Sequence, residues 1–470
     1  MKKLYIVITI IISFILYIFL GIIISYKKQP NISDDYISSF YLEDYYSDDI
    51  SCDRACIIED NKEALIERLR MIEMAEERII LSTFDFRSDN SGKDILAALY
   101  SAAERGLDIK VLVDGFSAFL QMYGNEYFFA LSTLDNVEIK IYNPINLLKP
   151  WKSMGRLHDK FLIVDNESYI IGGRNTFDYF LGDKGYKNYD RDVLVYNTKP
   201  YSKESSIYDL IDYFYKVWNL KECKLFNDEE YKGKRKKVIK AREELKEIYK
   251  SNIDKYPFLL EDFDYQEITY EVNKISLLSN PVHVYAKEPT VFYSLIQLMN
   301  NAKEEVKIHT PYIICNDFMY QAIRSVTSSG TKVSIMTNSP ANNGNPFGAS
   351  DYIINRDKIL QTGAKIYEYE GGISYHGKSI TIDDNISIIG SFNMDLRSVY
   401  LSTETMVVID SEEINKQLKE YFKTYEEDAV YIIDKDRIEI PKGVVRQEFT
   451  EKKKLLIRII SRFNWLRFLM

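Results

Sequence analysis

Cysteine and histidine are both scarce in this sequence, with 4 of each among 470 residues. So few cysteines exclude a disulfide framework in a chain of this length. Cys52 and Cys56 could meet across one helical turn or as a small disulfide, or they could be two ordinary thiols. Because neither a histidine nor a second cysteine pair lies near them, the sequence predicts no zinc site.

An excess of basic residues is also missing. The chain has 61 Lys and Arg against 70 Asp and Glu, which gives a formal net charge of -9 at pH 7. Proteins that bind nucleic acids usually carry a basic surface that displaces counterions from phosphates. The composition therefore argues against a nucleic-acid partner, while the length allows two or three domains.

Charge is absent from the first segment of the chain. The 22 residues from Leu4 to Ser25 are uncharged and consist mainly of Ile, Leu and Phe. A helix of this length crosses a hydrocarbon core of about 30 Å. No short apolar core with a small-residue cleavage site, typical of a signal peptide, is evident. The sequence therefore predicts a single-pass transmembrane anchor at residues 1–26.

The charges that flank this anchor bear on its orientation. Lys2 and Lys3 on one side are balanced by Lys27 and Lys28 on the other. Basic flanks stay on the cytoplasmic side of a membrane, and the free amino group adds one positive charge to the N-terminal side. We therefore expect a cell-membrane protein with an inside N-terminus and its remaining residues outside the cytoplasm.

After a linker at residues 27–60, helix-like and strand-like stretches occur twice in the same order. Glycines just past several predicted helices can supply left-handed C-caps. Helices that alternate with short β-rich runs are typical of an α/β architecture with mixed sheets. The pattern predicts a duplicated fold with halves at 61–226 and 276–440. The first should contain helices at 62–75 and 95–105 and strands at 78–84, 109–113 and 137–142; the second should contain helices at 290–302 and 318–327 and strands at 305–310, 332–336 and 365–369.

A highly charged segment at residues 227–275 connects the two halves. It includes the basic run KGKRKK and the helix-like stretch AREELKEIYK. The basic run could contact lipid headgroups. A solvated helix between the halves is the preferred interpretation, because charge runs usually form wet surface.

The most specific signal is an ungapped match between the two halves. Residues 158–175 read HDKFLIVDNESYIIGGRN and residues 376–393 read HGKSITIDDNISIIGSFN, with 7 of 18 positions identical. Residues i and i+2 of a strand point to the same face, so the His and Lys of each H-x-K should project together. A later asparagine could return to the same pocket. Together the halves would gather His158, Lys160, Asn175, His376, Lys378 and Asn393.

These side chains suit attack on a phosphodiester. The lysines and asparagines would hold the non-bridging oxygens and stabilise the charge of the transition state. One histidine would form a phosphohistidine, while the other protonates the leaving alkoxide and then activates the acceptor. Because the lysines neutralise the phosphate, no metal or other cofactor is expected. His283 and His309 lack this repeated context and are interpreted as structural, and a duplicated fold without activity is the alternative.

With H-x-K-x4-D-x6-G-[GS]-x-N present twice, the chain resembles the phospholipase D superfamily. Further details resemble the bacterial cardiolipin synthases within it. The resemblance runs from about Glu63 to the C-terminus and is specific to the superfamily, but less so to the substrate. The matching details are GGRN at 172–175, GSFNMDLRS at 390–398, TPY at 310–312 and YNP at 142–144.

The resemblance implies two packed α/β/α halves with mixed sheets around a pseudo-twofold active site. It implies His158 as the nucleophile and His376 as the general acid and base. It also implies a carboxylate from the opposite half beside each histidine. Glu404 matches this position for His158, and Asp192 matches it for His376, with Asp190 as a nearby alternative.

Three further motif positions have supporting roles. Asp165 and Asp383 are expected to hold the loop after each motif strand, a structural role. Ser391 completes the usual Gly-Ser pair in the second motif, whereas the first motif has Gly173. The resemblance to cardiolipin synthases tolerates this departure, which could make the two phosphate-binding halves unequal.

The C-terminal segment, residues 441–470, predicts a second membrane contact. Lys454, Arg458 and Arg462 recur at intervals of four and would form a cationic stripe on a helix. Such a basic amphipathic helix lies in the interface of an anionic bilayer, and a helix packed on the domain is the alternative. Lys452 and Lys453 extend the basic side, and Leu455, Leu456, Ile459, Ile460, Phe463 and Leu466 form the apolar side.

The expected function is transfer of phosphatidyl groups between phospholipids, with cardiolipin synthesis from phosphatidylglycerol as the preferred reaction. Residues 4–25 and 452–470 would hold the site against the membrane. A hydrolytic phospholipase D would share every residue named and would differ in how well water is excluded. A nuclease of the superfamily is disfavoured by the acidic charge and the anchor, and a silent scaffold is disfavoured by two intact motifs. The oligomeric state is left open.

Overall fold

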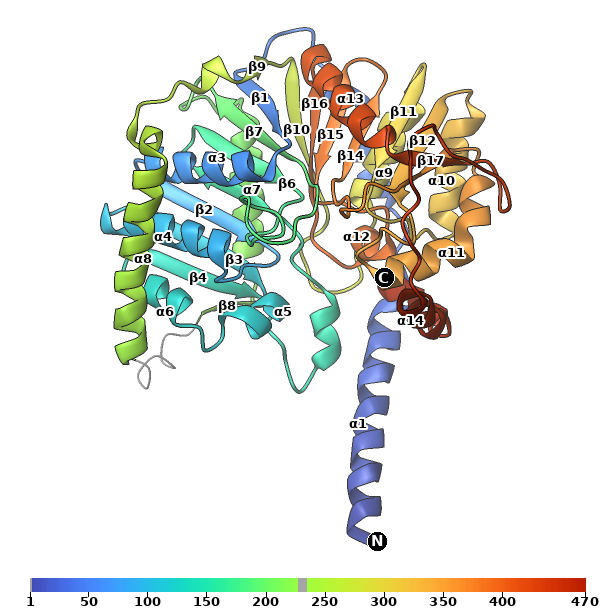
Figure 1. The fold of residues 1–470 in the computed structure, drawn as a ribbon, viewed down its shortest axis with the longest axis horizontal. Coiled ribbons are helices and arrows are strands. Elements are labelled where there is room, and N and C mark those ends of the chain that lie inside the picture. The colour runs from blue at the N-terminus through green and yellow to red at the C-terminus, as the bar shows by residue number, and fades with distance from the viewer. Residues whose placement is uncertain (1, 227–234) are drawn as a thin grey trace.

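Two nine-stranded mixed sheets lie side by side, and helix α1 (Lys2–Tyr26) projects away from both (Figure 1). The computed structural model describes residues 2–226 and 235–470. This architecture confirms the predicted α/β class with two repeated halves.

The first sheet has the strand order β8-β4-β3-β2-β5-β6-β7-β1-β9. Strand β2 pairs parallel with β3, and β3 pairs parallel with β4. The other pairs are antiparallel. The strands are β1 (Asp53–Ile58), β2 (Arg78–Thr83), β3 (Asp108–Asp114), β4 (Val137–Tyr142), β5 (Phe161–Val164), β6 (Ser168–Gly172), β7 (Asp192–Asn197), β8 (Cys223–Leu225) and β9 (Tyr270–Glu271).

The second sheet repeats this topology. Read from β17, its order is β17-β13-β12-β11-β14-β15-β16-β10, and β11–β12 and β12–β13 are again its parallel pairs. These eight strands thus have counterparts in the first sheet, as duplication requires, whereas the edge strands β18, beside β17, and β9, beside β1, are specific to one half each. The strands are β10 (Lys274–Ser279), β11 (Glu305–His309), β12 (Lys332–Asn338), β13 (Lys365–Tyr369), β14 (Ser379–Ile382), β15 (Ile386–Gly390), β16 (Thr405–Asp410), β17 (Ala429–Ile432) and β18 (Ile438–Glu439).

The ten predicted helices and strands are all present. The largest difference is at α4, which begins at Asn90 because the Asp89 carboxylate accepts a hydrogen bond from the Gly92 amide and caps the helix. Gly106 and Gly330 follow helices with φ of 99° and 96°, a conformation that favours glycine. The longer helices of the halves are α3 (Asn61–Met74), α4 (Asn90–Glu104), α7 (Ser206–Trp218), α8 (Arg235–Lys255), α9 (Thr290–Asn300), α10 (Asp317–Ser328), α11 (Pro346–Leu360), α13 (Glu412–Glu426) and α14 (Glu451–Ser461).

Short helical turns connect the larger elements. The segment Ala118–Met122 (η2) is π-helical, and two 3-10 turns, η3 (Pro150–Met154) and η7 (Asn464–Leu469), lie near α1. The remaining turns are α2 (Asp34–Ser39), η1 (Leu42–Tyr45), α5 (Gly115–Ser117), α6 (Glu126–Ser132), η5 (Pro257–Leu260), η6 (Tyr265–Glu267) and α12 (Leu396–Tyr400).

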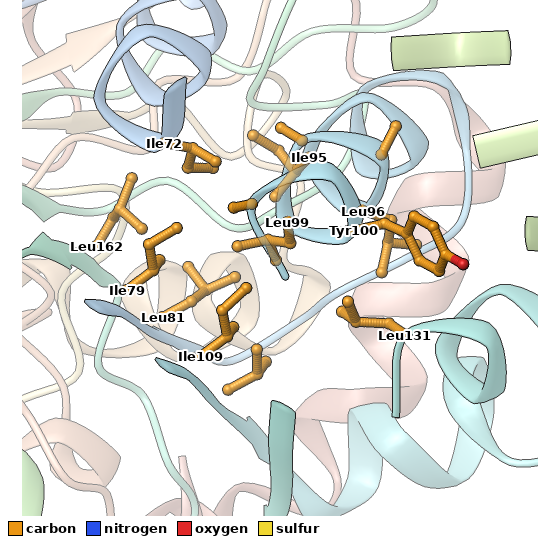
Figure 2. Packing of buried hydrophobic residues seen from close by; sticks show 14 of the residues in the cluster. Ile72, Ile79, Leu81, Ile95, Leu96, Leu99, Tyr100, Ile109, Leu131 and Leu162 are labelled. Atoms are coloured by element: carbon orange, nitrogen blue, oxygen red, sulfur yellow. The ribbon is translucent and has the colours of Figure 1, made fainter. Parts of the chain in front are cut away.

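The core of the first half lies between its sheet and the helices α3, α4 and α6. Figure 2 shows Leu96 and Leu99 of α4 packed among side chains of β2, β3 and neighbouring helices. Both leucines have no exposed surface. Burying one such side chain contributes about 1.5–3 kcal/mol, so this layer holds the strands that lead to the site.

Two predicted connecting segments take part in the fold. Strand β1 lies within residues 27–60, which had been assigned to a linker, and it pairs along its whole length with β7. The charged segment contributes β9 and helix α8, whose residues Val238, Ala241 and Leu245 are buried against the first half. Part of the KGKRKK run lies outside the described residues.

The cysteines are all free thiols. Cys52 directly precedes β1, and Cys56 lies within it. Four residues of extended chain span about 13 Å, whereas a disulfide requires Cα atoms within about 7 Å. The two thiols therefore cannot pair in this fold.

Helix α1 is the one helix in the described ranges that is long and apolar enough to cross a membrane. Its end is fixed to the remainder of the chain by Tyr26, whose buried hydroxyl donates to the Val284 carbonyl at 3.2 Å. Gly21 faces Trp151, where an added Cβ would lie 2.3 Å from the indole ring. The helix is therefore attached to the two halves by close contacts near its C-terminal end.

The C-terminal segment packs on the second half and leaves part of its apolar side exposed. Helix α14 packs on α11 and buries Ile457 and Ile460. Leu455, Ile459 and Phe463 are about half exposed. The helix ends at Ser461, and the chain continues into η7 beside α12.

Candidate active site

The first motif histidine lies between the two halves of the molecule. His158 precedes β5, and its backbone amide donates to the Thr403 hydroxyl at 3.1 Å. Its Nδ1 lies 2.9 Å from Oε1 of Glu404, the residue directly before β16 in the second half. The second half therefore orients the histidine of the first, and the expected contact between His158 and Glu404 is present.

The second motif histidine has the reciprocal arrangement. His376 precedes β14, and its amide donates to the Tyr189 carbonyl at 2.6 Å. Its Nδ1 lies 2.6 Å from Oδ2 of Asp190, a residue of the first half. Each half thus supplies one histidine and the carboxylate that holds the other.

Asp190, and not Asp192, is the carboxylate beside His376. The side chain of Asp192 points instead into the first half, where it lies 2.8 Å from Arg68 and 3.4 Å from Arg174. Asp192 is the first residue of β7, whereas Asp190 lies two residues before the strand begins.

The sheet register explains why Asp190 is the equivalent of Glu404. The second glycine-bearing strand pairs its glycine with Met406, and the first pairs its glycine with Asp192. Counting back two residues from each gives Glu404 and Asp190. Aligning the apolar runs that follow, VLV and VVI, would have given this match from the sequence alone.

The two motifs differ at Gly173 and Ser391, and this difference matches the difference in length between the Asp190 and Glu404 side chains. A Cβ on Gly173 would lie 2.1 Å from Oδ1 of Asp190, so the short carboxylate packs directly on the backbone. In the second half the Ser391 hydroxyl donates to Oε2 of Glu404 at 2.5 Å. Glycine is thus the residue that leaves room for Asp190.

Both motif lysines are buried beneath the histidines. The H-x-K segments lie in extended chain just before β5 and β14 and not within the strands. Nζ of Lys160 donates to the His158 carbonyl at 2.5 Å, and Nζ of Lys378 lies 2.6 Å from Nδ1 of His376. Burial lowers the pKa of Lys160 to about 7 and that of Lys378 to about 8.

Both histidines open into one cavity of about 320 Å³. Asn175 and Asn393 also line it, and the side-chain oxygen of each is buried without a hydrogen-bond partner. A buried polar atom without a partner costs free energy unless a ligand or water satisfies it. The structure therefore brings the predicted histidines and asparagines together around one space.

Burial and nearby lysines hold both imidazoles of the site neutral. Burial, followed by the nearby charges of Lys160 and Lys378, holds the pKa of His158 well below its usual value. Burial and Lys378 lower the pKa of His376 to about 4, although Asp190 opposes this shift. Burial alone would raise the pKa of Asp190, but Lys378 and His376 lower it to about 2.

Several residues of the cavity lie outside the repeated motif positions: Tyr312 and Arg397 fall in the TPY and GSFNMDLRS segments, whereas Arg156 and Phe84 were not singled out from the sequence. Arg156 and Arg397 line it, and Arg156 forms an ion pair with Asp114 at 2.5 Å. Phe84 and Tyr312 complete opposite parts of the wall. None of these positions is repeated between the two motifs, so the internal comparison gave no signal for them.

The motif aspartates hold turns at the far ends of the motif strands. Asp165 and Asp383 have φ of 52° and 46°. The carboxylate of Asp165 accepts from the amides of Glu76, Glu77 and Arg78, and that of Asp383 accepts from the equivalent three amides before β11. Each aspartate thereby fixes the start of the strand that pairs with its motif strand, β2 in the first half and β11 in the second.

The two remaining histidines lie outside the cavity. His309 is buried at the end of β11, stacked on Phe422 with ring centroids 3.6 Å apart, and its Nε2 lies 3.2 Å from Glu426. His283 is exposed in the loop after β10.

Comparison with known proteins supplies the relatives of this chain. A sequence model for the family described as "Cardiolipin synthase, PLD-like domain" matches residues 69–218 and 295–425, together more than half of the chain. The chain is 29% identical over 364 residues to a cardiolipin synthase of Clostridium perfringens, covering 76% of this chain and 67% of the relative. It is 25% identical over 421 residues to cardiolipin synthase C of Escherichia coli K12, covering 81% and 86%.

A solved structure shares the fold. The phosphatidylserine synthase of Haemophilus influenzae Rd KW20 superposes with a TM-score of 0.63 at 15% identity, covering 88% of this chain and 95% of that protein.

Proposed function

The chain belongs to the phospholipase D-like family of cardiolipin synthase domains, and on this basis we propose that it joins two phosphatidylglycerol molecules into cardiolipin with release of glycerol. It is a phosphatidyltransferase of the phospholipase D superfamily that acts on phospholipids. The choice of phosphatidylglycerol as donor and acceptor, and the phosphohistidine intermediate, are the parts that we propose.

One observation carries this proposal. Two histidines face a single cavity, and each is held through Nδ1 by a carboxylate from the opposite half, Glu404 or Asp190. With Nδ1 engaged, Nε2 is the nitrogen that faces the substrate. One histidine can thus act as the nucleophile and the other as the general acid and base on a phosphate bound between them.

In the first step, Nε2 of His158 attacks the phosphorus of the donor lipid. A bond forms between nitrogen and phosphorus, and the bond from phosphorus to the headgroup glycerol breaks. The anionic phosphodiester raises the pKa of His376 when it binds, and the protonated imidazole then gives its proton to the departing glycerol oxygen. The lowered pKa of His158 keeps its imidazole neutral and therefore nucleophilic at pH 7.

In the second step, a hydroxyl of another phosphatidylglycerol headgroup attacks the phosphatidyl-His158 intermediate. His376, now neutral, removes the proton of that hydroxyl, and His158 leaves the phosphorus. The products are cardiolipin and the enzyme in its initial protonation state. If water attacks instead, the same residues produce phosphatidic acid.

The lysines and asparagines are assigned to the non-bridging phosphate oxygens. Lys160 and Lys378 lie beneath the histidines, and the amides of Asn175 and Asn393 face the cavity. A phosphate between the two lysines raises their pKa values, because an opposite charge favours the ammonium form. Electrostatic stabilisation of this kind is usually the largest contribution to catalysis.

The membrane arrangement belongs to the same proposal. We assign residues 4–25 to a single transmembrane helix and residues 452–470 to an interfacial contact, with the catalytic halves outside the cytoplasm. Support comes from the apolar length of α1 and from the exposed apolar side chains of α14.

Purified protein in mixed micelles with labelled phosphatidylglycerol tests the reaction. We expect labelled cardiolipin and free glycerol from the wild type, and neither from His158→Ala or His376→Ala. Rapid denaturation of the wild type at alkaline pH should leave phosphate label on the protein, and later acid treatment should release it, because the phosphorus–nitrogen bond of a phosphohistidine is stable to alkali and labile to acid. His158→Ala should carry no such label. Phosphatidic acid as the sole product would replace the transferase proposal by a hydrolase, and no turnover of phospholipid would refute both.

A further inference from the structure

An apolar cavity of about 330 Å³ lies directly beside the catalytic pocket. The two spaces share a wall made by Met154, Tyr312, Asp395 and Arg397. The mechanism proposed above uses none of the apolar side chains beyond this wall, which are Ile314, Phe347, Leu466, Leu469 and Met470.

The shared wall changes from polar to apolar within a few side chains. On the catalytic side, the Tyr312 hydroxyl accepts a hydrogen bond from Nδ2 of Asn393 at 3.3 Å. Arg397 donates to the carbonyls of Met154 at 3.0 Å and Leu469 at 2.8 Å, and so joins η3 to the C-terminal segment. A ligand that fills both spaces therefore needs a phosphate at the histidines and hydrocarbon beyond Arg397.

The elements that build the apolar cavity also contact the anchor helix. Trp151 of η3 lies 4.9 Å from Tyr17, and Trp465 of η7 lies 5.5 Å from Phe19, measured between ring centroids. Figure 1 shows the C-terminus and α14 at the point where α1 leaves the two halves. The apolar cavity thus lies on the side of the molecule from which α1 emerges.

A loop extends this side along α1. The Tyr17 hydroxyl donates to the Leu148 carbonyl at 2.7 Å, and Leu147 and Leu148 are 79% and 78% exposed. Tyr17 precedes the end of α1 by nine residues, which is about 13 Å along a helix axis. Two exposed leucines at this level lie within the hydrocarbon if α1 spans the bilayer.

We propose that the apolar cavity binds one acyl chain of the phosphatidyl donor, an assignment that rests on the proposed function. Its volume is at the lower end of ligand pockets, which suits part of one chain better than two. Anchoring the diacylglycerol moiety there leaves the headgroup glycerol as the mobile side of the phosphodiester. The cavity thereby selects which ester bond breaks when His158 attacks.

Short-chain phosphatidylglycerols, used below their critical micelle concentrations, test this assignment, because the acyl chain of a monomeric lipid enters the cavity directly from water. Burial of one methylene changes an equilibrium by about fourfold. Two additional methylenes per chain, in dihexanoyl against dibutyroyl lipid, should raise wild-type kcat/KM about fifteenfold if one chain enters the cavity. Leu466→Asp and Phe347→Asp should reduce the ratio of kcat/KM for dihexanoyl lipid to that for dibutyroyl lipid below about threefold. Ile440→Asp, at an exposed position, should leave this ratio unchanged.

A phosphodiester without acyl chains, bis(p-nitrophenyl) phosphate, separates this proposal from the reaction itself. The two cavity variants should lower kcat/KM for dihexanoyl lipid at least tenfold more than for the chain-free diester. Equal losses on both substrates, or no loss on either, would overturn the acyl-chain assignment. Failure of the wild type to cleave any phosphodiester would instead refute the proposed function.

Discussion

The two histidines differ in the carboxylates that hold them. His158 faces the longer Glu404, which is supported by the Ser391 hydroxyl, and His376 faces the shorter Asp190 packed on Gly173. Asp190 has a lowered pKa, whereas burial raises the pKa of Glu404 well above its usual value. This inequality gives the two halves different proton affinities, as a nucleophile and a general acid require.

Replacement of Asp190 tests the corrected assignment. Asp190→Asn should lower kcat by about 10²–10⁴-fold, the usual contribution of a general acid–base group, and should shift the pH dependence assigned to His376. Asp192→Asn is the matched control: it leaves Arg68 and Arg174 without their carboxylate and should lower the melting temperature. A larger loss of kcat in Asp192→Asn than in Asp190→Asn, at equal folded fraction, would restore the original assignment.

Gly173 gives a second prediction at this scale. Gly173→Ser restores the usual Gly-Ser pair but places Cβ where Asp190 lies, so kcat should fall at least about 100-fold with displacement of His376. Ser391→Gly removes one hydrogen bond to Glu404 and should have a smaller effect. Wild-type activity in Gly173→Ser would show that the carboxylate does not need this space.

The buried lysines predict an alkaline limb in the pH profile. Lys160 and Lys378 have pKa values lowered to about 7 and 8, and each holds phosphate only while protonated. The kcat/KM for phosphatidylglycerol, which reports the free enzyme, should therefore fall as pH rises through this range. The limb in kcat should lie at higher pH, because bound phosphate raises both pKa values. A kcat/KM that increases steadily from pH 7 to 9 would contradict this.

The repeated part of the site was predictable, and the unrepeated part was not. His158, Lys160 and Asn175 recur in register in the second half, so internal comparison identifies them. Asp192 was preferred over the alternative Asp190 because the two carboxylates lie only two residues apart, and the internal comparison gave no signal for Arg397 because its counterpart in the first half differs. Contacts that depend on strand register or on one half alone leave little trace in a single sequence.

At the scale of elements, the predicted helices and strands were correct where periodicity and glycine caps agreed. Strand β1 was missed because its partner β7 lies far along the chain, and a six-residue run carries little local signal. Helix α8 was predicted as solvated because its charges dominate, yet a narrow stripe that includes Leu245 is buried. Both elements are placed by contacts with residues distant in the sequence, strand pairing for β1 and burial against the first half for α8.

The turns held by Asp165 and Asp383 allow a matched stability test. Asp165→Ala removes the acceptor of three backbone amides and leaves alanine at a φ of 52°. We expect the free energy of unfolding to fall by about 3 kcal/mol, measured by urea unfolding in detergent. Asp165→Asn should cost less, since asparagine tolerates this φ. Asp383→Ala should behave alike, and a change below about 0.5 kcal/mol would contradict the structural role.

At the scale of the whole molecule, the orientation of the anchor can be tested by thiol labelling. The native cysteines give little background because three are buried and one is partly buried. Tyr201→Cys places a thiol at a 97% exposed site of the first half. A membrane-impermeant maleimide should label it in intact cells, whereas Lys3→Cys should react only after permeabilisation. The reverse pattern would place the catalytic halves in the cytoplasm.

The exchange of carboxylates between the halves also has a consequence for folding. Each half has its own buried core, and domains generally fold as units before they dock. Neither histidine acquires its carboxylate until docking is complete, because Glu404 and Asp190 come from across the interface. During refolding, enzymatic activity should therefore recover later than the circular dichroism signal of the helices. The delay between the two signals measures the time that two folded halves need to dock.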